Sequence, residues 1–537
     1  MKSHFCLTVL SACSIAVAAW AECPPLLVWQ NSFGGDRLDL HFAIQPLTEG
    51  GYLLAGSSAS TVSGNKTSPF YGGIITGGDG WLVRVDAQGQ KFSERTFGGS
   101  DGDQFFVMET TSEGGVVLGG KSRSPADGNK TSPNHGSDDF WVVRLDADGN
   151  VLWDRTYGGA NSDYLQALKP TADGGFILVG YSGSPPGGTK TAPNYGTIDA
   201  WLVRVDAQGN PLWDVSFGGS SVEDLKDVLV LPDGGFLAGG RAASTDGDLA
   251  GLNHGNEDAW VIRLDAQGRL LWQKTYGGSG SDQLRALQPA PDGGFLLAGH
   301  SESVPSGNKT APHRGGIDYW VVRVDAGGNV LWDRTFGGSD FDILRRAAAM
   351  PNGGWILAGQ SAGGPSGNKT SGSYGEVNIW LVRIDLDGNS EWDLSLGGSE
   401  GEIALALAVT PDGGIITGGF SGSLPGTGIK TTPFYGVLNN FVEATDSWIV
   451  ELAPDSDCDG VPNSRDVCPN TAADAVVNAS GCSIEQLVPC EGPWENHGQY
   501  VTAVRDAVAA FQRAGLIGQT TARSIVQQAV HSDCGKQ

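Results

Sequence analysis

Residues 318–339 read DYWVVRVDAGGNVLWDRTFGGS, and this stretch describes two short strands joined by a tight turn. Trp320, Val322 and Val324 alternate along the chain with their neighbours, which is the two-residue period of a strand. The Gly-Gly pair in the turn supplies the positive φ angles that tight hairpins need. The stretch therefore predicts a β-hairpin.

The same unit recurs along most of the chain at a spacing of roughly 60 residues. Each copy continues into an apolar run, a turn such as Asp292-Gly293-Gly294, a second apolar run and a polar loop that often contains Asn-Lys-Thr. One Trp marks each copy: Trp81, Trp141, Trp201, Trp260, Trp320, Trp380 and Trp448. Seven copies of four short strands predict an all-β, seven-bladed β-propeller, with a linear solenoid as the alternative.

The two ends of the repeat array complement each other. Residues 26–35, LLVWQNSFGG, match the fourth strand of a unit, and residues 446–452, DSWIVEL, match the third. We therefore expect the N-terminal strand to complete the last blade and close the ring, which removes open sheet edges.

The composition indicates an exported protein. Residues 1–21 read as a signal peptide, with a lipoprotein box at residues 10–13 as the alternative, and no later segment is apolar enough to span a membrane. The net charge of −26 disfavours nucleic acid and anionic lipid. We expect a secreted, cell-surface or periplasmic monomer with a propeller at residues 22–454, a calcium segment at 455–490 and a helical hairpin at 491–537.

A short acidic stretch after the propeller has the spacing of a calcium-binding loop. Oxygen ligands stand at loop positions 1, 3, 5, 9 and 12, a Gly stands at position 6 for the turn, and position 7 offers a carbonyl. In that order the ligands are Asp455, Asp457, Asp459, Asn463 and Asp466, with Gly460 in the turn and the carbonyl of Val461. These residues predict a Ca²⁺ site; the alternative is an acidic solvated linker.

Two resemblances follow from these motifs. DSDCDGVPNSRDVCPNT with VVNASGC resembles a bacterial thrombospondin type 3 repeat over residues 455–482, which implies calcium binding and a spacer role; Cys458 departs from it, because such repeats often carry Gly there. The repeats at residues 26–452 resemble a repeat of about 60 residues common in exported bacterial proteins. That second resemblance implies export and a propeller, with no single activity.

The cysteines concentrate in the C-terminal region. After the signal peptide the chain keeps Cys23, Cys458, Cys468, Cys482, Cys490 and Cys534, whose pairing the sequence leaves open. Apolar spacing predicts a helix over residues 497–513 and a second helix from Thr521. Cys490 and Cys534 flank this hairpin, so we expect a disulfide to close it.

An acidic residue follows each Gly-Gly step between units. This set comprises Asp39, Asp103, Asp163, Asp224, Asp282, Asp342 and Glu402. We interpret these side chains as caps that accept backbone N–H groups of their own loops; the alternative is a cation site at the mouth of the channel.

The first and last units have longer loops than the others. The loop Lys precedes the blade Trp by 11 residues in four copies, but Lys66 precedes Trp81 by 15 and Lys430 precedes Trp448 by 18. Both long loops contain Pro-Phe-Tyr-Gly, and we expect them to lie side by side at the ring seam. The aromatic residues Phe70, Tyr71, Phe434 and Tyr435 are candidates to bind a protein or carbohydrate ligand, or else they pack the seam.

Together these features predict an exported, calcium-binding propeller that acts as a binding, cell-surface interaction or adhesion-type protein. One alternative is a polysaccharide hydrolase or lyase, for which Glu443 and Asp79 on the long loops are the suggestive acids. Another is a structural scaffold without a ligand. We assign no catalytic residue.

Overall fold

The computed structural model describes residues 23–72, 78–436, 445–472 and 475–536. The signal-peptide prediction and Glu443 therefore lie outside the described residues. Contacts divide the chain into two compact units. Pro24–Pro454 with Gly460–Val467 form the first, and the described residues of the second are Cys23, Asp455–Asp459, 468–472 and 475–536.

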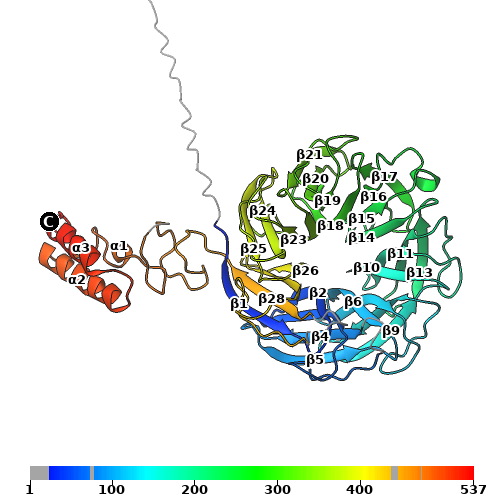
Figure 1. The fold of residues 1–537 in the computed structure, drawn as a ribbon, viewed down its shortest axis with the longest axis horizontal. Helices are drawn as coiled ribbons and strands as arrows, with labels where there is room; N and C mark the ends of the chain where they lie inside the picture. The colour runs from blue at the N-terminus through cyan, green and yellow to red at the C-terminus, as the bar shows by residue number, and fades with distance from the viewer. Residues whose placement is uncertain (1–22, 73–77, 437–444, 473–474, 537) are drawn as a thin grey trace, which may run out of the picture. The chain divides into compact units, whose positions relative to one another are not determined.

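The first unit is a seven-bladed β-propeller. Within the described residues, seven antiparallel sheets of four strands follow one another around a ring (Figure 1). The inner strand of each blade contacts the inner strand of the next, and β26 contacts β2. The inner strands are β2 (Asp39–Pro46), β6 (Asp103–Thr110), β10 (Asp163–Pro170), β14 (Glu223–Val230), β18 (Asp282–Pro289), β22 (Asp342–Ala349) and β26 (Glu402–Val409).

The other strands of each blade run outward from the inner strand. The second strands are β3 (Tyr52–Ser58), β7 (Val116–Ser122), β11 (Phe176–Ser182), β15 (Phe236–Ala242), β19 (Phe295–Ser301), β23 (Trp355–Ala362) and β27 (Ile415–Ser421). The third strands are β4 (Asp79–Val85), β8 (Asp139–Leu145), β12 (Asp199–Val205), β16 (Asp258–Leu264), β20 (Asp318–Val324), β24 (Val377–Ile384) and β28 (Ser447–Ala453). The rim strands are β5 (Lys91–Phe97), β9 (Val151–Tyr157), β13 (Pro211–Phe217), β17 (Leu270–Tyr276), β21 (Val330–Phe336), β25 (Ser390–Leu396) and β1 (Leu26–Phe33).

The turn between the third and fourth strands shows how the repeat sequence sets the hairpin. In blade five, Asp325 Oδ1 accepts hydrogen bonds from the backbone N–H groups of Gly327 at 2.9 Å and Asn329 at 2.8 Å. Gly328 has a φ of 74°, a conformation that a side chain disfavours. The Asp-x-Gly-Gly-Asn sequence thus predicts this turn correctly.

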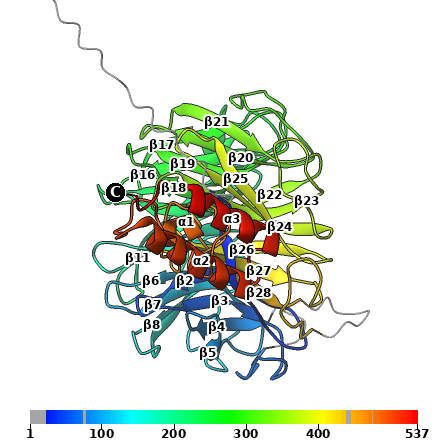
Figure 2. The ribbon, with the colours of Figure 1, turned by 90° about the vertical axis from the view of Figure 1, so that its left-hand side faces the viewer.

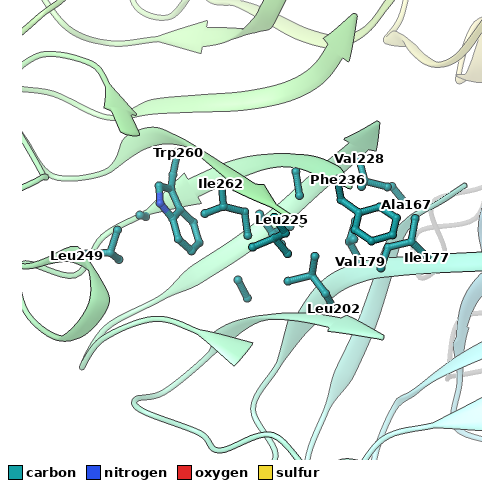
Figure 3. Packing of buried hydrophobic residues seen from close by; sticks show 14 residues of the cluster. Ala167, Ile177, Val179, Leu202, Leu225, Val228, Phe236, Leu249, Trp260 and Ile262 are labelled. Atoms are coloured by element: carbon teal, nitrogen blue, oxygen red, sulfur yellow. The ribbon is translucent and has the colours of Figure 1, made fainter. Parts of the chain in front are cut away.

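The hydrophobic core lies between neighbouring sheets. Figure 3 shows Val179 and Leu202 of blade three packed toward Leu225 and Trp260 of blade four. Each marker Trp of the seven repeats is at most 3% exposed. Because every sheet is covered on both faces by its neighbours, the second and third strands are almost wholly buried, including polar positions such as Ser182, Asp199 and Arg204.

The Asn-Lys-Thr loops form hydrogen bonds that hold parts of a blade together. In blade two, Asn129 Oδ1 accepts the backbone N–H of Gly98 at 2.8 Å. Lys130 is 3% exposed, and its ammonium group donates to the carbonyl of Ser132. Asn129 and Lys130 therefore stabilise their own loop through hydrogen bonds to the backbone.

A carboxylate or amide on the rim strand links this loop to the marker Trp. Asp154 accepts hydrogen bonds from Trp141 Nε1 at 3.2 Å and from Thr131. The acceptors of the seven marker Trp residues, in chain order of the blades, are Glu94, Asp154, Asp214, Gln273, Asp333, Asp393 and Gln30. The last of these acceptors comes from the beginning of the chain.

The seventh sheet combines strands from both ends of the array. Its order is β1-β28-β27-β26, and β1 pairs antiparallel with β28 from Leu26↔Ala453 to Phe33↔Ser447. Gln30 Oε1 accepts Trp448 Nε1 at 3.1 Å and the backbone N–H of Thr431 at 3.1 Å. In this blade Gln30 thus has the role that Asp154 has in blade two.

In the part that the structure describes, the second unit contains the helices α1 (Ile484–Leu487), α2 (His497–Arg513) and α3 (Gln519–His531). Figures 1 and 2 show α2 and α3 side by side, and Val504, Val508 and Phe511 bury one face of α2. The predicted bounds of the first long helix match α2. The second begins at Gln519 rather than at the predicted Thr521, because Gly518 already provides the extended N-cap.

The described residues contain three disulfides. Cys490–Cys534 closes the helical hairpin, as predicted, and Cys468–Cys482 and Cys23–Cys458 are the other two. The short helix α1 was not predicted; a capping box between Ser483 and Gln486 starts it. Among the described residues, no helix has the length and apolar character to cross a membrane. A 3₁₀ turn, Gly247–Leu249, lies in the loop of blade four.

Candidate functional site

Three of the predicted calcium ligands gather in the second unit. One ligand oxygen from each of Asp455, Asp457 and Asp459 lies within 4.8 Å of the others. These carboxylates stand at alternate residues of a short bent segment, in which Cys458 has a positive φ. Three carboxylates at this distance are a donor set that suits a hard divalent cation.

Asp457 is oriented by the segment that follows the loop. Its Oδ2 accepts the backbone N–H of Thr471 at 2.6 Å. Its Oδ1 is buried and accepts no hydrogen bond from the described residues. A buried carboxylate oxygen without a donor is unfavourable unless a cation supplies the partner charge, so this oxygen fits a metal ligand.

The structure shows why a Cys can stand at position 458, where thrombospondin-type repeats often carry Gly. Cys458 has a φ of 64°, in the left-handed region where Gly is favoured. Its side chain forms the disulfide with Cys23. Gly460 also has a positive φ, 87°, as expected of the turn position. Val461, Asn463 and Asp466, the other predicted ligands, belong to the first unit, where a turn joins the N–H of Asn463 to the carbonyl of Pro454.

Tyr435 packs on the neighbouring blade. A β-carbon built on Gly64 would lie 2.8 Å from the Tyr435 Cβ, and Asn65 Nδ2 donates to the Tyr435 hydroxyl at 3.4 Å. His135 and Tyr374 occupy equivalent places in their blades, beside glycines of the next blade. Tyr435 therefore fills a packing position that the repeat uses elsewhere; Phe434 beside it is half-buried.

Tyr71 lies at a different seam. The neighbouring Gly72 is close to the carbonyl of Asp101, on the connection to blade two. Tyr71 is 39% exposed and its backbone N–H donates to Asp79, while Phe70 is half-buried. The structure thus places the two Phe-Tyr pairs at successive seams. The insertions at residues 73–77 and 437–444 lie outside the described residues.

The acids at the starts of the inner strands are buried caps. Each accepts the backbone N–H of the Gly four residues earlier, as Asp103 does from Gly99 at 2.8 Å. The seven caps are Asp39, Asp103, Asp163, Glu223, Asp282, Asp342 and Glu402, and each is fully buried. The capping interpretation is confirmed, with one correction. In blade four the cap is Glu223, because Asp224 is one residue too late and contacts Lys226 and Arg241 instead.

A second acid faces six of the seven caps, and the neutral Asn378 faces the seventh, Glu402. Asp139 precedes the marker Trp of its blade, and a β-carbon on Gly158 would lie 2.1 Å from Asp139 Oδ1 and 2.7 Å from Asp163 Oδ2. Burial, together with the negative charge of Asp163, raises the pKa of Asp139 to about 7. Asp79, Asp258 and Asp446 have pKa values raised to about 7 for the same two reasons. Sequence reasoning missed these pairs.

The centre of the propeller carries charges that the sequence analysis did not single out. The fourth residue of each inner strand lines a cavity of about 180 Å³ together with Arg346. Lys226, Arg285 and Arg345 occupy this position in β14, β18 and β22. The repeat register could have found them, because the three positions are equivalent in consecutive units.

Comparisons with known proteins find a distantly similar sequence and several structures of similar arrangement, but no protein-family model that matches the chain. The regulatory protein FlaEY of Caulobacter vibrioides is 24% identical over 477 residues, which are 82% of this chain and 48% of that protein, so the chain spans about half the length of this relative.

Solved structures with a similar arrangement include the WD40 β-propeller domain of Doa1 and BamB from Moraxella catarrhalis. The first has a TM-score of 0.42 and 12% identity, covering 79% of this chain and 96% of that chain. The second has a TM-score of 0.34 and 13% identity, covering 79% and 100%. The propeller assignment itself rests on the strand pairing described above.

Proposed function

We propose that this chain is an exported, calcium-binding β-propeller that acts as a binding or interaction protein at the cell surface, in the periplasm or outside the cell. The observation that carries the proposal is the carboxylate cluster of Asp455, Asp457 and Asp459. In this proposal Val461, Asn463 and Asp466 complete the ligand set of a thrombospondin type 3-like repeat at residues 455–482. Calcium there has a structural role, because an all-oxygen site on a short segment orders its backbone.

Three disulfides support export. Structural disulfides persist in oxidising compartments, and the C-terminal unit uses Cys490–Cys534 and Cys468–Cys482 around a small core. Residues 1–21 would then be the signal peptide. The repeats at residues 26–452 would belong to the exported bacterial type of about 60 residues, with β1 closing the ring.

An interaction role is favoured over polysaccharide cleavage. Asp79, one of the two suggestive catalytic acids, is fully buried and bonded to the backbone of Tyr71. A carboxylate in that setting cannot reach a glycosidic oxygen. The match to a relative described as a regulatory protein is also consistent with binding. The proposed ligand face includes Phe70, Tyr71, Phe434 and Tyr435, of which Tyr71 offers the most exposed large aromatic surface.

Calorimetric titration of Ca²⁺ into the chelated, signal-peptide-free protein tests the metal proposal. We expect one high-affinity site in the wild type and at least a tenfold weaker site in Asp457→Asn and Asp459→Asn, since each loses a charged ligand. Asp148→Asn, in an exposed hairpin turn, is the matched control and should bind as the wild type does. Absence of binding heat, or unchanged heat in both loop variants, would contradict the proposal.

A further inference from the structure

The central cavity of the propeller collects basic side chains in an acidic chain. The chain has 60 acidic and 34 basic residues, yet no carboxylate lines this cavity among the described residues. Its lining consists of Phe42, Phe106, Gln166, Lys226, Arg285, Arg345, Arg346 and Leu405. Four cationic side chains from three consecutive inner strands therefore face one small volume.

Two of these cations have only neutral partners. Arg285 Nη2 donates to Gln283 Oε1 at 2.9 Å, and Arg345 Nη2 donates to Gln360 Oε1 at 3.1 Å. Neither guanidinium forms an ion pair with a described residue. Arg285 Nε is also buried without a hydrogen-bond acceptor in the described part of the chain. Amide oxygens hold the two groups in place, and the nearby Asp224 attracts Arg285 without pairing with it, so neither guanidinium has a described carboxylate in direct contact.

The other cations near this layer have carboxylate partners. Lys226 lies 3.1 Å from Asp224, and Asp227 attracts Arg346. One layer further along the channel, Lys169 pairs with Glu109 in an adjoining cavity of about 370 Å³. Among the four cations of this layer, only Lys226 forms an ion pair with a described residue. Arg285 is attracted by Asp224 and Arg346 by Asp227, without direct ion pairs, and no described carboxylate pairs with Arg345.

The electrostatic effect of these cations extends to their neighbours. Burial and the charge of Arg345 lower the pKa of Arg285 to about 10. His300 is buried nearby, and burial together with the charges of Arg285 and Arg345 lowers its pKa to about 3. His300 is consequently neutral at physiological pH. An anion in the cavity would be attracted by both guanidinium groups in an environment with little water.

The same layer also presents an aromatic surface. The Phe42 and Phe106 rings form an edge-to-face pair with centroids 5.2 Å apart. They belong to β2 and β6, and with Leu405 of β26 they form the apolar part of the lining. A ligand that suits the layer therefore combines an oxyanion with an apolar or ring-shaped portion.

We propose that the central channel binds a small organic anion, a carboxylate or a phosphate ester, with Arg285 and Arg345 on the oxyanion and Phe42 and Phe106 on the apolar portion. Planar guanidinium groups match the geometry of both oxyanions, which is why the chemistry is shared. This site is separate from the calcium segment and does not depend on calcium binding.

Titration of the signal-peptide-free protein in chloride-free buffer, with and without Ca²⁺, tests this inference. The probes are phenyl phosphate, benzoate and inorganic phosphate. We expect phenyl phosphate or benzoate to bind and to raise the melting temperature. Whichever of the two binds more tightly identifies the oxyanion that the site prefers. Inorganic phosphate, which lacks the ring, should bind more weakly than phenyl phosphate. The double variant Arg285→Gln/Arg345→Gln should bind at least tenfold more weakly.

Stability provides the check on folding. Because the two guanidinium groups repel each other, the double variant should melt no lower than the wild type when no probe is present. Arg95→Gln, on an exposed rim strand, has the same type of substitution and should keep the wild-type affinity. The inference is overturned if no probe binds the wild type, or if the double variant binds the probes as tightly as Arg95→Gln does.

Discussion

Asn378 occupies a position where the other six blades carry an aspartate that faces the buried cap. Its Oδ1 accepts the backbone N–H of Tyr374 at 2.8 Å, as the aspartates do from the corresponding residues. Its Nδ2 stands near Glu402, where the aspartates place their second oxygen. The fold accommodates a neutral amide at this position without a compensating charge. Because a protonated carboxyl resembles an amide in charge and shape, this indicates that the equivalent aspartates are best accommodated when they are protonated.

Stability should consequently fall as pH rises from about 4 to about 7. The pKa of Asp139 is about 7 in the fold, against an ordinary value of 3.8. Between these two pH values Asp139 is ionised in the unfolded chain but still protonated in the fold. Each rise in pH over this range therefore stabilises the unfolded state relative to the fold. The same sign holds for Asp79, Asp258 and Asp446. Calorimetry in the presence of a chelator should give a higher melting temperature at pH 5 than at pH 8.

Asp139→Asn should raise the free energy of unfolding at pH 8 by roughly 1–3 kcal/mol and change it little at pH 4, because it removes the cost of ionising a buried carboxyl. Asn378→Asp should have the reverse effect and steepen the pH dependence. Asp148→Asn, which is exposed, serves as the control. Equal effects of Asp139→Asn at both pH values would show that ionisation of Asp139 does not cost the fold stability.

At the scale of strands and loops, one acceptor connects three parts of a blade. Asp333 on β21 accepts Trp320 Nε1 at 3.0 Å and the backbone N–H groups of Thr310 and Ala311. Gln273 and Gln30 do the same for the marker Trp of two other blades. An oxygen acceptor at this place is therefore required, whereas a negative charge is not.

Asp333→Ala should lower the free energy of unfolding by roughly 2–4 kcal/mol, because it leaves several buried N–H groups without an acceptor. Asp333→Asn should cost less than half as much. Denaturant titration followed by Trp fluorescence measures both changes. Similar losses in the two variants would mean that charge, rather than acceptance of hydrogen bonds, matters here.

The strands and turns could be predicted because local residues determine them: the turn at Asp325–Asn329 and the alternation around Trp320 need no long-range information. Other features depend on which blades meet. Asp446 faces Asp39 although the two are at opposite ends of the array. Glu223 and Asp224 are adjacent acids, and only strand register decides that one caps a loop while the other pairs with Lys226 and Arg241. Arg285 and Arg345 meet because equivalent positions converge at the centre.

For the molecule as a whole, the seventh sheet is the one built from two distant segments. Removing residues 22–33 deletes β1 and exposes the edge of β28, so we expect a lower melting temperature and self-association. A synthetic peptide of residues 24–33 should restore the monomer, while the same peptide with Gln30→Ala should restore it less well. Light scattering and calorimetry report both effects. A truncated chain that stays monomeric with an unchanged melting temperature would contradict this view.

The pairing of Leu26 with Ala453 also has a kinetic consequence. The first strand to emerge during synthesis has no partner until almost the whole propeller has followed it, while the intervening blades can form from local meanders. Until that final step the chain has two unpaired edges, and the N-terminal strand of one molecule can occupy the last blade of another. Protein concentration during refolding should therefore set the yield of monomer, independently of how stable the finished ring is.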